Sequence, residues 1–492
     1  MSTIVVIGGG IGGLVTAARL AHAGHTVHLF EQSATLGGKL NHIEHDGCSF
    51  ETGPTLVTMP VVLEKFFASV GMTMSDTLTL DRVDPACHYR WSDGSRLDLP
   101  FDLDAIPSAI DQFAPGEGAA VRKYLEDARE LYDLTKDVFI FSEFDGFREF
   151  VKPRNASLLR HLPKLQLGST LHQVHRKRFR DPRVIQLFDR FATYNGSSPY
   201  RAPATLTVIP WVEMGLGSWY PRGGMYAIAE AIGGAARACG AHLHTSTSVR
   251  RIRHSRGKVT GVELRDGTVV DADHVVSNVD VHVTRHHLLG MKQSEPSNLS
   301  TSGLVLLASV ERRDRGLAHH NVLFADNYRA EFNALQHDKL PDQQATVYVS
   351  RSVHADATRA PDGYENWFVL VNAPPRGVAP DLNGNEQSVW HGIEQDRAQQ
   401  VLDRIGVFTE APVVRSMVVR TPDTMAREWS SYRGALYGAS SNSMLSAFLR
   451  PRQRSTDLQN LWYVGGSAHP GGGIPLVATS GMIAADCILR QS

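Results

Sequence analysis

The residues best placed to do chemistry form a glycine-rich turn close to the N-terminus. The run Gly8-Gly9-Gly10-Ile11-Gly12-Gly13 follows an apolar stretch, and Glu31 stands 18 residues after Gly13. Gly8 permits a tight turn, Gly10 lets the backbone approach a pyrophosphate, and Gly13 lets a helix pack closely on a strand. Glu31 would accept hydrogen bonds from a ribose and repel a 2′-phosphate. This spacing predicts an adenine dinucleotide site rather than an ordinary glycine turn.

Three elements must position these residues. Residues 3–7 predict a buried parallel strand, residues 14–23 a helix, and residues 25–30 a second strand that ends at the acidic residue. The free N–H groups at the start of the helix would face the pyrophosphate. The N-terminal segment therefore predicts an α/β Rossmann unit.

Two further loops indicate which dinucleotide is bound. Gly37-Gly38-Lys39 comes soon after Glu31, and Gly53-Pro54-Thr55 follows. A nicotinamide-dependent dehydrogenase would continue into another strand and helix here. A glycine pair that ends in a cation instead suits a loop around an extended FAD, with Lys39 near the phosphates. The sequence therefore favours FAD.

The C-terminal end carries a second pattern typical of anion binding. Residues 461–464 predict a strand, residues 465–475 a glycine-rich turn, and residues 476–489 a helix. A strand, a glycine turn and a helix N-terminus together form a cradle for negative charge. In a flavoenzyme this cradle should face the flavin carbonyl at C2, with the Ile474 and Leu476 N–H groups as donors.

Acid and base residues give a weaker signal, and the catalytic residues stay unassigned. Glu213 and His469 are possible proton acceptors, although a structural role is more common for each. His319-His320 has no acidic partner at ligand spacing, and adjacent residues on a strand point in opposite directions. We therefore expect no metal site.

Composition narrows the class of protein. The chain has 492 residues and a formal net charge of −1, which gives no general attraction to nucleic acid or to an anionic membrane. Its four cysteines lack metal-ligand or redox-pair spacing, which argues for a reducing compartment. We find no signal peptide and no apolar run near the ~20 residues that span a bilayer. We expect a cytoplasmic protein, or one attached to the cytoplasmic face of the membrane.

The predicted elements divide the chain into three regions. Residues 249–271 are expected to form a three-stranded meander that covers the adenine, with Val249 as a backbone contact. The expected regions are a discontinuous FAD-binding domain (1–58, 216–284 and 455–492), a substrate-binding domain (59–130 and 285–454) and a helical subdomain (131–215).

A second sheet is expected in the substrate-binding region. Apolar runs at residues 303–310, 346–350 and 367–371 predict strands of a mixed sheet suited to line a substrate cavity. Residues 388–402 predict an amphipathic helix beside it.

Together these motifs resemble the bacterial carotenoid desaturases of the phytoene-dehydrogenase family along nearly the whole chain. The resemblance rests on residues 8–31, Gly37-Gly38-Lys39, Gly53-Pro54-Thr55, Gly223-Gly224-Met225 and residues 469–475. It implies a glutathione-reductase-like FAD-binding fold, non-covalent FAD, an acyclic polyene substrate and attachment to one membrane face. The expected cofactor-binding residues are Gly8, Gly10, Ile11, Gly12, Gly13, Glu31, Gln32, Gly38, Lys39, Gly53, Pro54, Thr55, Val249, Gly465, Gly466, Ile474, Pro475 and Leu476.

The subfamily follows from finer similarities. Most members carry Thr where this chain has Ala468, and residues 191–200 and 433–438 are similar to later-acting members. Those members are terminal-methyl oxidases of C30 carotenoids and hydroxycarotenoid 3,4-desaturases. A first-step phytoene or diapophytoene (dehydrosqualene) desaturase is the alternative. In each case hydride would leave a C30 or C40 polyene, and electrons would pass to oxygen or a membrane quinone.

A local basic segment supports a lipid substrate. Residues 150–180 contain eight Lys or Arg, no acidic residue, and leucines at helical spacing. Such a segment suits a membrane surface, with leucines in the acyl boundary and cations among anionic headgroups. A solvated basic face on a helical domain is the alternative.

Two other functions stay open on the sequence. One is a soluble flavin amine oxidase with a polar substrate. The other is a non-catalytic prenyl-lipid carrier similar to the Rab GDP-dissociation inhibitors. The intact phosphate-binding turns and Glu31 argue against the carrier.

Overall fold

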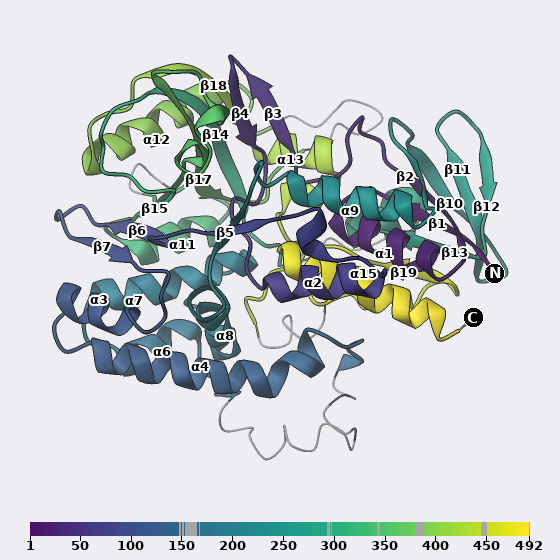
Figure 1. Ribbon diagram of the computed structural model, residues 1–492, viewed down its shortest axis with the longest axis horizontal. Coiled ribbons are helices and arrows are strands. Elements are labelled where there is room, and N and C mark those ends of the chain that lie inside the picture. The colour runs from purple at the N-terminus through teal and green to yellow at the C-terminus, as the bar shows by residue number, and fades with distance from the viewer. Residues whose placement is uncertain are drawn as a thin grey trace.

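The computed structural model describes most of the chain. Outside the description are residues 147–148, 150–151, 153–164, 167, 293–295, 297, 342–344, 379–387, 444–449 and 492. About half of the basic, leucine-containing segment expected at the membrane, including Leu158, Leu159 and Leu162, therefore lies outside the described residues. Figure 1 shows two sheets beside each other, with helices on the outside of both.

The first sheet is parallel and brings together both ends of the chain. Its five strands run in the order β19-β13-β1-β2-β9, and every neighbouring pair is parallel. The strands expected at residues 3–7, 25–30 and 461–464 all belong to it. The five strands are β1 (Thr3–Ile7), β2 (Thr26–Phe30), β9 (His242–His244), β13 (His274–Ser277) and β19 (Leu461–Tyr463).

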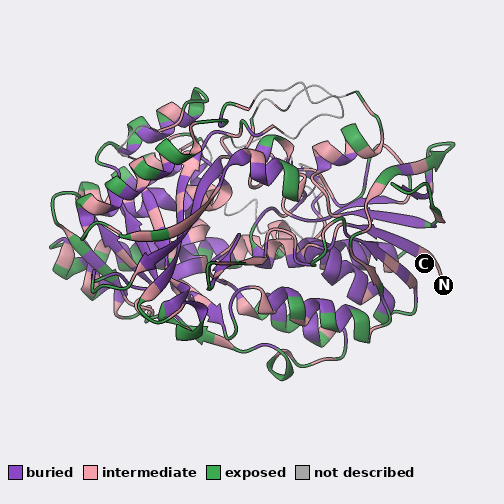
Figure 2. Cartoon of the chain, turned by 90° about the horizontal axis from the view of Figure 1, so that it is seen from above, coloured by how far each residue is buried: buried purple, intermediate pink, exposed green. Residues whose placement is uncertain are grey.

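Both faces of this sheet are buried, which explains why its strands are apolar. Ile4 and Val6 pack against helices, whereas Val5 and Ile7 point to the other face and pack against the predicted meander. Figure 2 shows these strands as buried, with exposed residues on the outer helices. The covering elements are α1 (Ile11–His22), α2 (Pro60–Ser69), α9 (Ala227–Ala238) and α15 (Ile474–Leu489), and the meander strands β10 (Val249–Ser255), β11 (Lys258–Leu264) and β12 (Val269–Asp271).

The second sheet has seven strands, in the order β18-β14-β17-β16-β15-β6-β7, and only the β15–β6 pair is parallel. The three strands expected in the substrate-binding region belong to it. Leu304 and Leu306 pack on one face, and Val305 and Phe368 on the other. The strands are β6 (Cys87–Arg90), β7 (Arg96–Leu99), β14 (Ser302–Glu311), β15 (His320–Leu323), β16 (Val347–Ser350), β17 (Tyr364–Ala373) and β18 (Val414–Arg420).

The helix expected at residues 388–402 begins later than predicted. Helix α12 spans Glu394–Phe408. The residues before it form a turn in which the Trp390 N–H donates to Ser388 Oγ at 2.9 Å. That turn buries the Trp390 indole in the core of the second sheet. Burial of this aromatic side chain explains the apolar signal without a helix.

A helical layer covers the β6–β7 end of the second sheet (Figure 1). It consists of α3 (Ile106–Phe113), α4 (Gly118–Phe139), α6 (Leu171–Arg178), α7 (Pro182–Asp189), α8 (Val208–Pro210) and a π-helix over Trp211–Gly215. Smaller elements are β3 (His42–His45), β4 (Cys48–Glu51), β5 (Leu80–Arg82), β8 (Trp219–Pro221), α10 (Val281–Val283), α11 (Tyr328–Gln336) and α13 (Pro422–Trp429). Among the described residues, no helix combines the length and the apolar character needed to cross a bilayer.

Candidate functional site

The glycine turn joins β1 to α1 with the geometry that its sequence predicts. Gly8 has φ +95°, a conformation that glycine adopts freely. A Cβ atom on Gly13 would collide with the Gly8 carbonyl, so this glycine allows α1 to approach β1. No side chain caps α1, whose first turn also lacks an acidic residue. The N–H groups of Ile11 and Gly12 are therefore available to an anion.

Glu31 links the end of β2 to this turn. Its Oε2 accepts a hydrogen bond from the Gly9 N–H at 2.7 Å, and its Oε1 accepts one from the Ser33 N–H at 2.8 Å. The carboxylate is only 7% exposed. Each carboxylate oxygen can accept more than one hydrogen bond, so Glu31 can also receive ribose hydroxyls.

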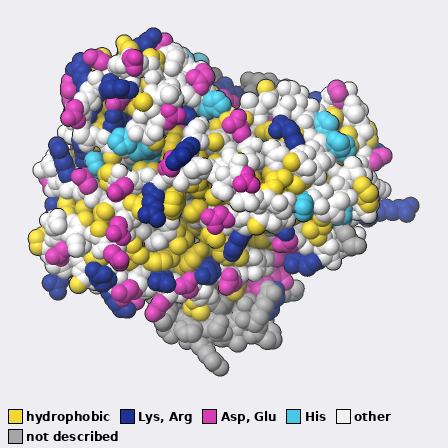
Figure 3. All heavy atoms as spheres, in the orientation of Figure 1, with side chains coloured by type: hydrophobic (Ala, Val, Ile, Leu, Met, Phe, Trp, Pro, Cys, Tyr) yellow, Lys and Arg dark blue, Asp and Glu magenta, His cyan; other side chains and the backbone are white. Residues whose placement is uncertain are grey.

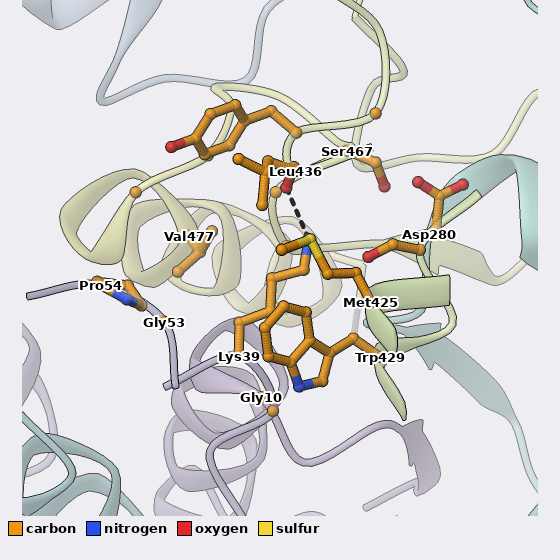
Figure 4. A pocket seen from close by; sticks show the side chains of 18 of the residues that line it. Gly10, Lys39, Gly53, Pro54, Asp280, Met425, Trp429, Leu436, Ser467 and Val477 are labelled. Carbon is orange, nitrogen blue, oxygen red and sulfur yellow. Dashed lines mark hydrogen bonds between the residues drawn. The ribbon is translucent and has the colours of Figure 1, made fainter. Parts of the chain in front are cut away.

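The Gly37–Lys39 loop packs directly on the glycine turn, and the Gly37 N–H donates to Gly9 O at 2.8 Å. Figure 4 shows Lys39 reaching across the cavity to Leu436, whose carbonyl accepts from Lys39 Nζ at 2.6 Å. Burial lowers the pKa of Lys39 to about 8, although the Asp280 carboxylate counteracts this. A buried ammonium with this pKa would gain from a phosphate in the same cavity.

The C-terminal turn forms the opposite side of the cradle. Helix α15 begins at Ile474 after Gly473, has no side-chain cap and carries Pro475 in its first turn. The first main-chain bond of the helix joins the Val477 N–H to Gly473 O at 2.9 Å. The Ile474 and Leu476 N–H groups precede this bond and can donate to an anion in the cavity, and their contact with the flavin stays a prediction.

One cavity of about 2230 Å³ connects these features. Every expected cofactor-binding residue lines it except Gly13, whose role is to pack α1 on β1. Two uncapped helix N-termini, an acidic residue after β2 and a buried lysine line the same space. This donor set fits an extended adenine dinucleotide.

Two lining residues, Asn278 and Asp280, were not predicted. A Cβ atom on Gly10 or Gly12 would lie 2.8 Å from the Asn278 side-chain amide. Asp280 accepts hydrogen bonds from the N–H groups of His282 and Val283, and burial raises its pKa. Both follow β13 at the carboxyl edge of the parallel sheet. Ligands of such sheets bind at the carboxyl ends of the strands. The position of both residues after a predicted strand could therefore have identified them as site residues.

Beyond the glycine turns the same cavity runs along the second sheet. Val305, Val322, Phe368 and Leu370 line this part from the strands. Leu206, Ile209 and Val212 line it from the helical layer. These apolar side chains form a wall that is continuous with the dinucleotide cradle, and Thr346, Tyr348 and Asn372 add polar groups to it.

The two possible proton acceptors lie behind the cavity wall. Glu213 receives a hydrogen bond from Arg190 Nη2 at 2.5 Å and another from the Tyr194 hydroxyl. His469 stacks on Phe144 and hydrogen-bonds to Ser142 O at 3.1 Å. Burial lowers the pKa of His469 to about 4, so it stays neutral near pH 7. Neither residue lines the cavity, and no catalytic role is assigned to them.

The His319-His320 pair differs from expectation in its geometry. The two rings lie 4.3 Å apart instead of pointing in opposite directions. The reason is that β15 begins at His320, so His319 lies outside the alternation of the strand. In the described part of the chain, no group of three His, Cys, Asp or Glu side chains could hold a metal ion.

Comparisons with known proteins place this architecture in a family. Residues 11–338 match the flavin containing amine oxidoreductases. The 1-hydroxycarotenoid 3,4-desaturase of Flavobacterium sp. (strain P99-3) is 35% identical and is covered over 99% of both chains. The 4,4′-diapolycopene oxygenase of Methylomonas sp is 32% identical, over 99% of this chain and 98% of the relative.

Two further proteins show the breadth of the similarity. The zeta-carotene-forming phytoene desaturase of Myxococcus xanthus is 32% identical, over 99% of this chain and 93% of the relative. An oxidoreductase from Methanosarcina mazei shares the fold, with a TM-score of 0.63 and 19% identity over 99% of this chain and 100% of that one. The chain therefore belongs to the flavin containing amine oxidoreductase family, and within it to the carotenoid desaturases and oxygenases.

Proposed function

We propose that this FAD-dependent oxidoreductase acts on acyclic C30 or C40 carotenoids, at a later step such as terminal oxidation or 3,4-desaturation. The observation that carries the proposal is the continuous cavity from the dinucleotide cradle to an apolar wall. Its volume of about 2230 Å³ exceeds the roughly 300–1,000 Å³ of ordinary small-molecule pockets. A cofactor and a long polyene can therefore share it.

The residues of this chain would position the reactants and exclude water. Bound FAD would supply the acceptor for a hydride from the polyene. Main-chain N–H groups of the two glycine turns would hold the cofactor at opposite ends of the cradle. Val305, Phe368 and Leu370 would orient the polyene by shape, since a hydrocarbon offers few polar handles.

The later step is supported by two of the relatives. One is named a 3,4-desaturase of 1-hydroxycarotenoids and the other a diapolycopene oxygenase. A first-step desaturase is the alternative, supported by the similarity to a phytoene desaturase. A soluble amine oxidase is less well supported, because a polar amine would need a more polar wall.

We also propose that the protein collects its substrate at the cytoplasmic face of the membrane and passes electrons to oxygen or a quinone. Figure 3 shows hydrophobic side chains gathered in the middle of one face. Phe139 and Ile140, at the end of α4, line the cavity shortly before the basic segment in the chain. Failure to sediment with anionic lipid vesicles at low ionic strength would contradict membrane attachment.

Pigment analysis tests the main proposal. The chain is expressed with enzymes that supply C30 or C40 polyenes, and the pigments are followed by absorption and mass. Desaturation removes two hydrogens per new double bond and shifts absorption to the red, whereas terminal oxidation adds oxygen mass. A Gly10→Val variant, in which FAD binding is expected to be weakened, serves as the control with reduced cofactor content. Unchanged pigments with every polyene would refute the assignment to carotenoids.

A further inference from the structure

An ion pair lies at the wall of the cavity beyond the glycine turns, where other lining side chains are apolar or uncharged polar ones such as Thr193, Tyr348 and Asn372. Arg190 and Tyr194 come from the short helical segment Arg190–Asn195 that follows α7, and both line the cavity. Glu213 lies behind them on the π-helix. The three side chains form one cluster, since Glu213 accepts hydrogen bonds from both of the others. A hydrocarbon substrate gives no reason for ionised groups on this wall.

The guanidinium of Arg190 uses only part of its hydrogen-bonding capacity. Its Nη2 donates to Glu213 Oε1 and to the Tyr89 hydroxyl. Among the described residues, Nε and Nη1 make no hydrogen bond. Nε is fully buried, whereas Nη1 keeps some accessible surface, and the residue as a whole is 9% exposed. Nη1 is therefore a donor that a molecule in the cavity can use.

Tyr194 lies beside Arg190 and offers a hydrogen-bond acceptor next to the Arg190 donor. Its hydroxyl donates to Glu213 Oε2, and the phenolic oxygen, which also interacts with Arg190, keeps a lone pair that can accept a hydrogen bond. Burial, followed by the charge of Glu213, raises the pKa of Tyr194 well above its ordinary value, so the phenol stays neutral. The Arg190 Cζ lies 5.6 Å from the centre of the Tyr194 ring. The two side chains therefore lie beside each other in the cavity wall.

The charge balance identifies the group that fits. Glu213 neutralises Arg190, so the pair has no net charge to attract an anion. A neutral group that both accepts and donates a hydrogen bond matches Nη1 and the phenolic oxygen. Leu206, Ile209 and Val212 line the cavity from the same helical layer and are apolar, whereas Thr193 and Asn195 of the Arg190–Asn195 segment are polar and uncharged. The site therefore suits a hydroxyl attached to a hydrocarbon.

We propose that Arg190 and Tyr194 form a subsite for the terminal hydroxyl of a polyene, and that this subsite selects oxygen-bearing substrates over plain hydrocarbons. The inference rests on the proposed function, because it takes from that function that the molecule carrying the hydroxyl is a polyene. Within that function, it assigns the choice of substrate to two named side chains.

The test is a binding measurement on the FAD-loaded enzyme. Two probes are compared, an acyclic C40 polyene hydrocarbon and the same polyene with one terminal hydroxyl, and binding is followed by quenching of flavin fluorescence. We expect the wild type to bind the hydroxylated probe about tenfold more tightly. Arg190→Lys keeps a cation beside Glu213 but lacks the forked donors, and Tyr194→Phe keeps the ring but removes the acceptor. Either change should bring the affinity ratio close to one.

Tyr328→Phe is the matched control, because it removes a phenol that lines the same cavity from a different element, α11. Its affinity ratio should equal that of the wild type. The FAD content and flavin absorption of each variant are measured first. A change in flavin binding in Arg190→Lys with an unaltered affinity ratio would assign Arg190 to the cofactor and overturn the subsite.

The remaining outcomes separate the subsite from the proposed function. Equal affinity of the wild type for both probes, with oxidised products formed, overturns the subsite alone. A preference for the hydroxyl that the variants lose, with no oxidised product, supports the subsite and refutes the oxidoreductase proposal. Binding of neither probe overturns both.

Discussion

At the scale of single residues, the glycine turn has little free space. A Cβ atom on Gly10 would lie 2.8 Å from Asn278 Nδ2, so a side chain there must displace Asn278 or enter the cavity. We expect Gly10→Val to weaken FAD binding about 10- to 100-fold, as overpacking of a tight contact does. Flavin released on denaturation of the purified protein measures the effect.

The matched control for this substitution is Gly234→Val. Gly234 lies on α9, and a Cβ atom there would have no neighbouring atom within 4 Å, so the same side chain meets open space. Normal flavin content in both variants would mean that the pyrophosphate does not approach Gly10.

Lys39 makes FAD binding dependent on pH. Burial lowers its pKa to about 8 in the protein without cofactor, so it loses its proton above that pH. If its ammonium neutralises a phosphate, FAD binding above pH 8 must take up this proton. The affinity for FAD should then fall as the pH rises from 8 to 9.5, by at most about tenfold per pH unit. Titration of the apoprotein with FAD at several pH values measures this.

Two variants isolate the contribution of Lys39. Lys39→Met should bind FAD more weakly at pH 7 and lose the pH dependence, because no group then titrates. Lys39→Arg should keep the affinity at high pH, because arginine stays charged. An unchanged pH profile in Lys39→Met would show that another group is responsible.

At the scale of elements, Arg450 holds the turn between β19 and α15. Its guanidinium is buried and donates to three carbonyls, those of Tyr437, Ala439 and Gly466. Among the described residues it has no carboxylate partner, and burial lowers its pKa to about 10. The side chain thus fixes the C-terminal turn to the segment that also receives Lys39.

We expect Arg450→Met to loosen this turn. Three buried carbonyls would lose their donor, which should lower the free energy of unfolding by about 3 kcal/mol or more and weaken FAD binding. Thermal unfolding and FAD titration measure the two effects. Arg452→Met is the control, since Arg452 is 41% exposed and pairs with Asp145 at the surface. Equal losses in both variants would argue against a special role for Arg450.

Local patterns were sufficient for the strands and for the two glycine turns, because their signals lie within a few consecutive residues. They were insufficient where a tertiary contact decides the conformation. The apolar side chain of Trp390 is buried by a turn that precedes the helix. The helical spacing of apolar residues around it therefore predicted a helix that begins too early. The strand β15 starts at His320, so the alternation of side chains along a strand does not give the direction of the His319 side chain.

At the scale of the whole molecule, the cavity depends on contacts between distant parts of the chain. Gly12 and Gly465 lie so close that a Cβ atom on Gly12 would be 3.1 Å from the Gly465 N–H. The sequence predicted both turns and their convergence, since each motif is complete in itself. It could not predict that Arg190 and Tyr194 share Glu213, because no local rule relates residues on two helical segments that meet only in the fold.

This convergence predicts how the molecule responds to its cofactor. A dinucleotide held by both turns should slow amide hydrogen exchange at both ends of the chain together. We expect added FAD to protect the first turn of α1 and residues 465–477 in FAD-depleted protein, because each local opening must then also release the ligand. Mass spectrometry of peptic fragments measures the change.

Helix α3 provides the internal control for this experiment. It packs in the helical layer against β6 and β7 and contributes no residue to the cavity wall, so its exchange should stay constant. Protection of α1 without protection of residues 465–477 would mean that only the N-terminal turn holds the cofactor. The apolar wall along the second sheet would then lie too far from the reacting part of FAD, and the assignment of the cavity to an oxidised polyene would fail.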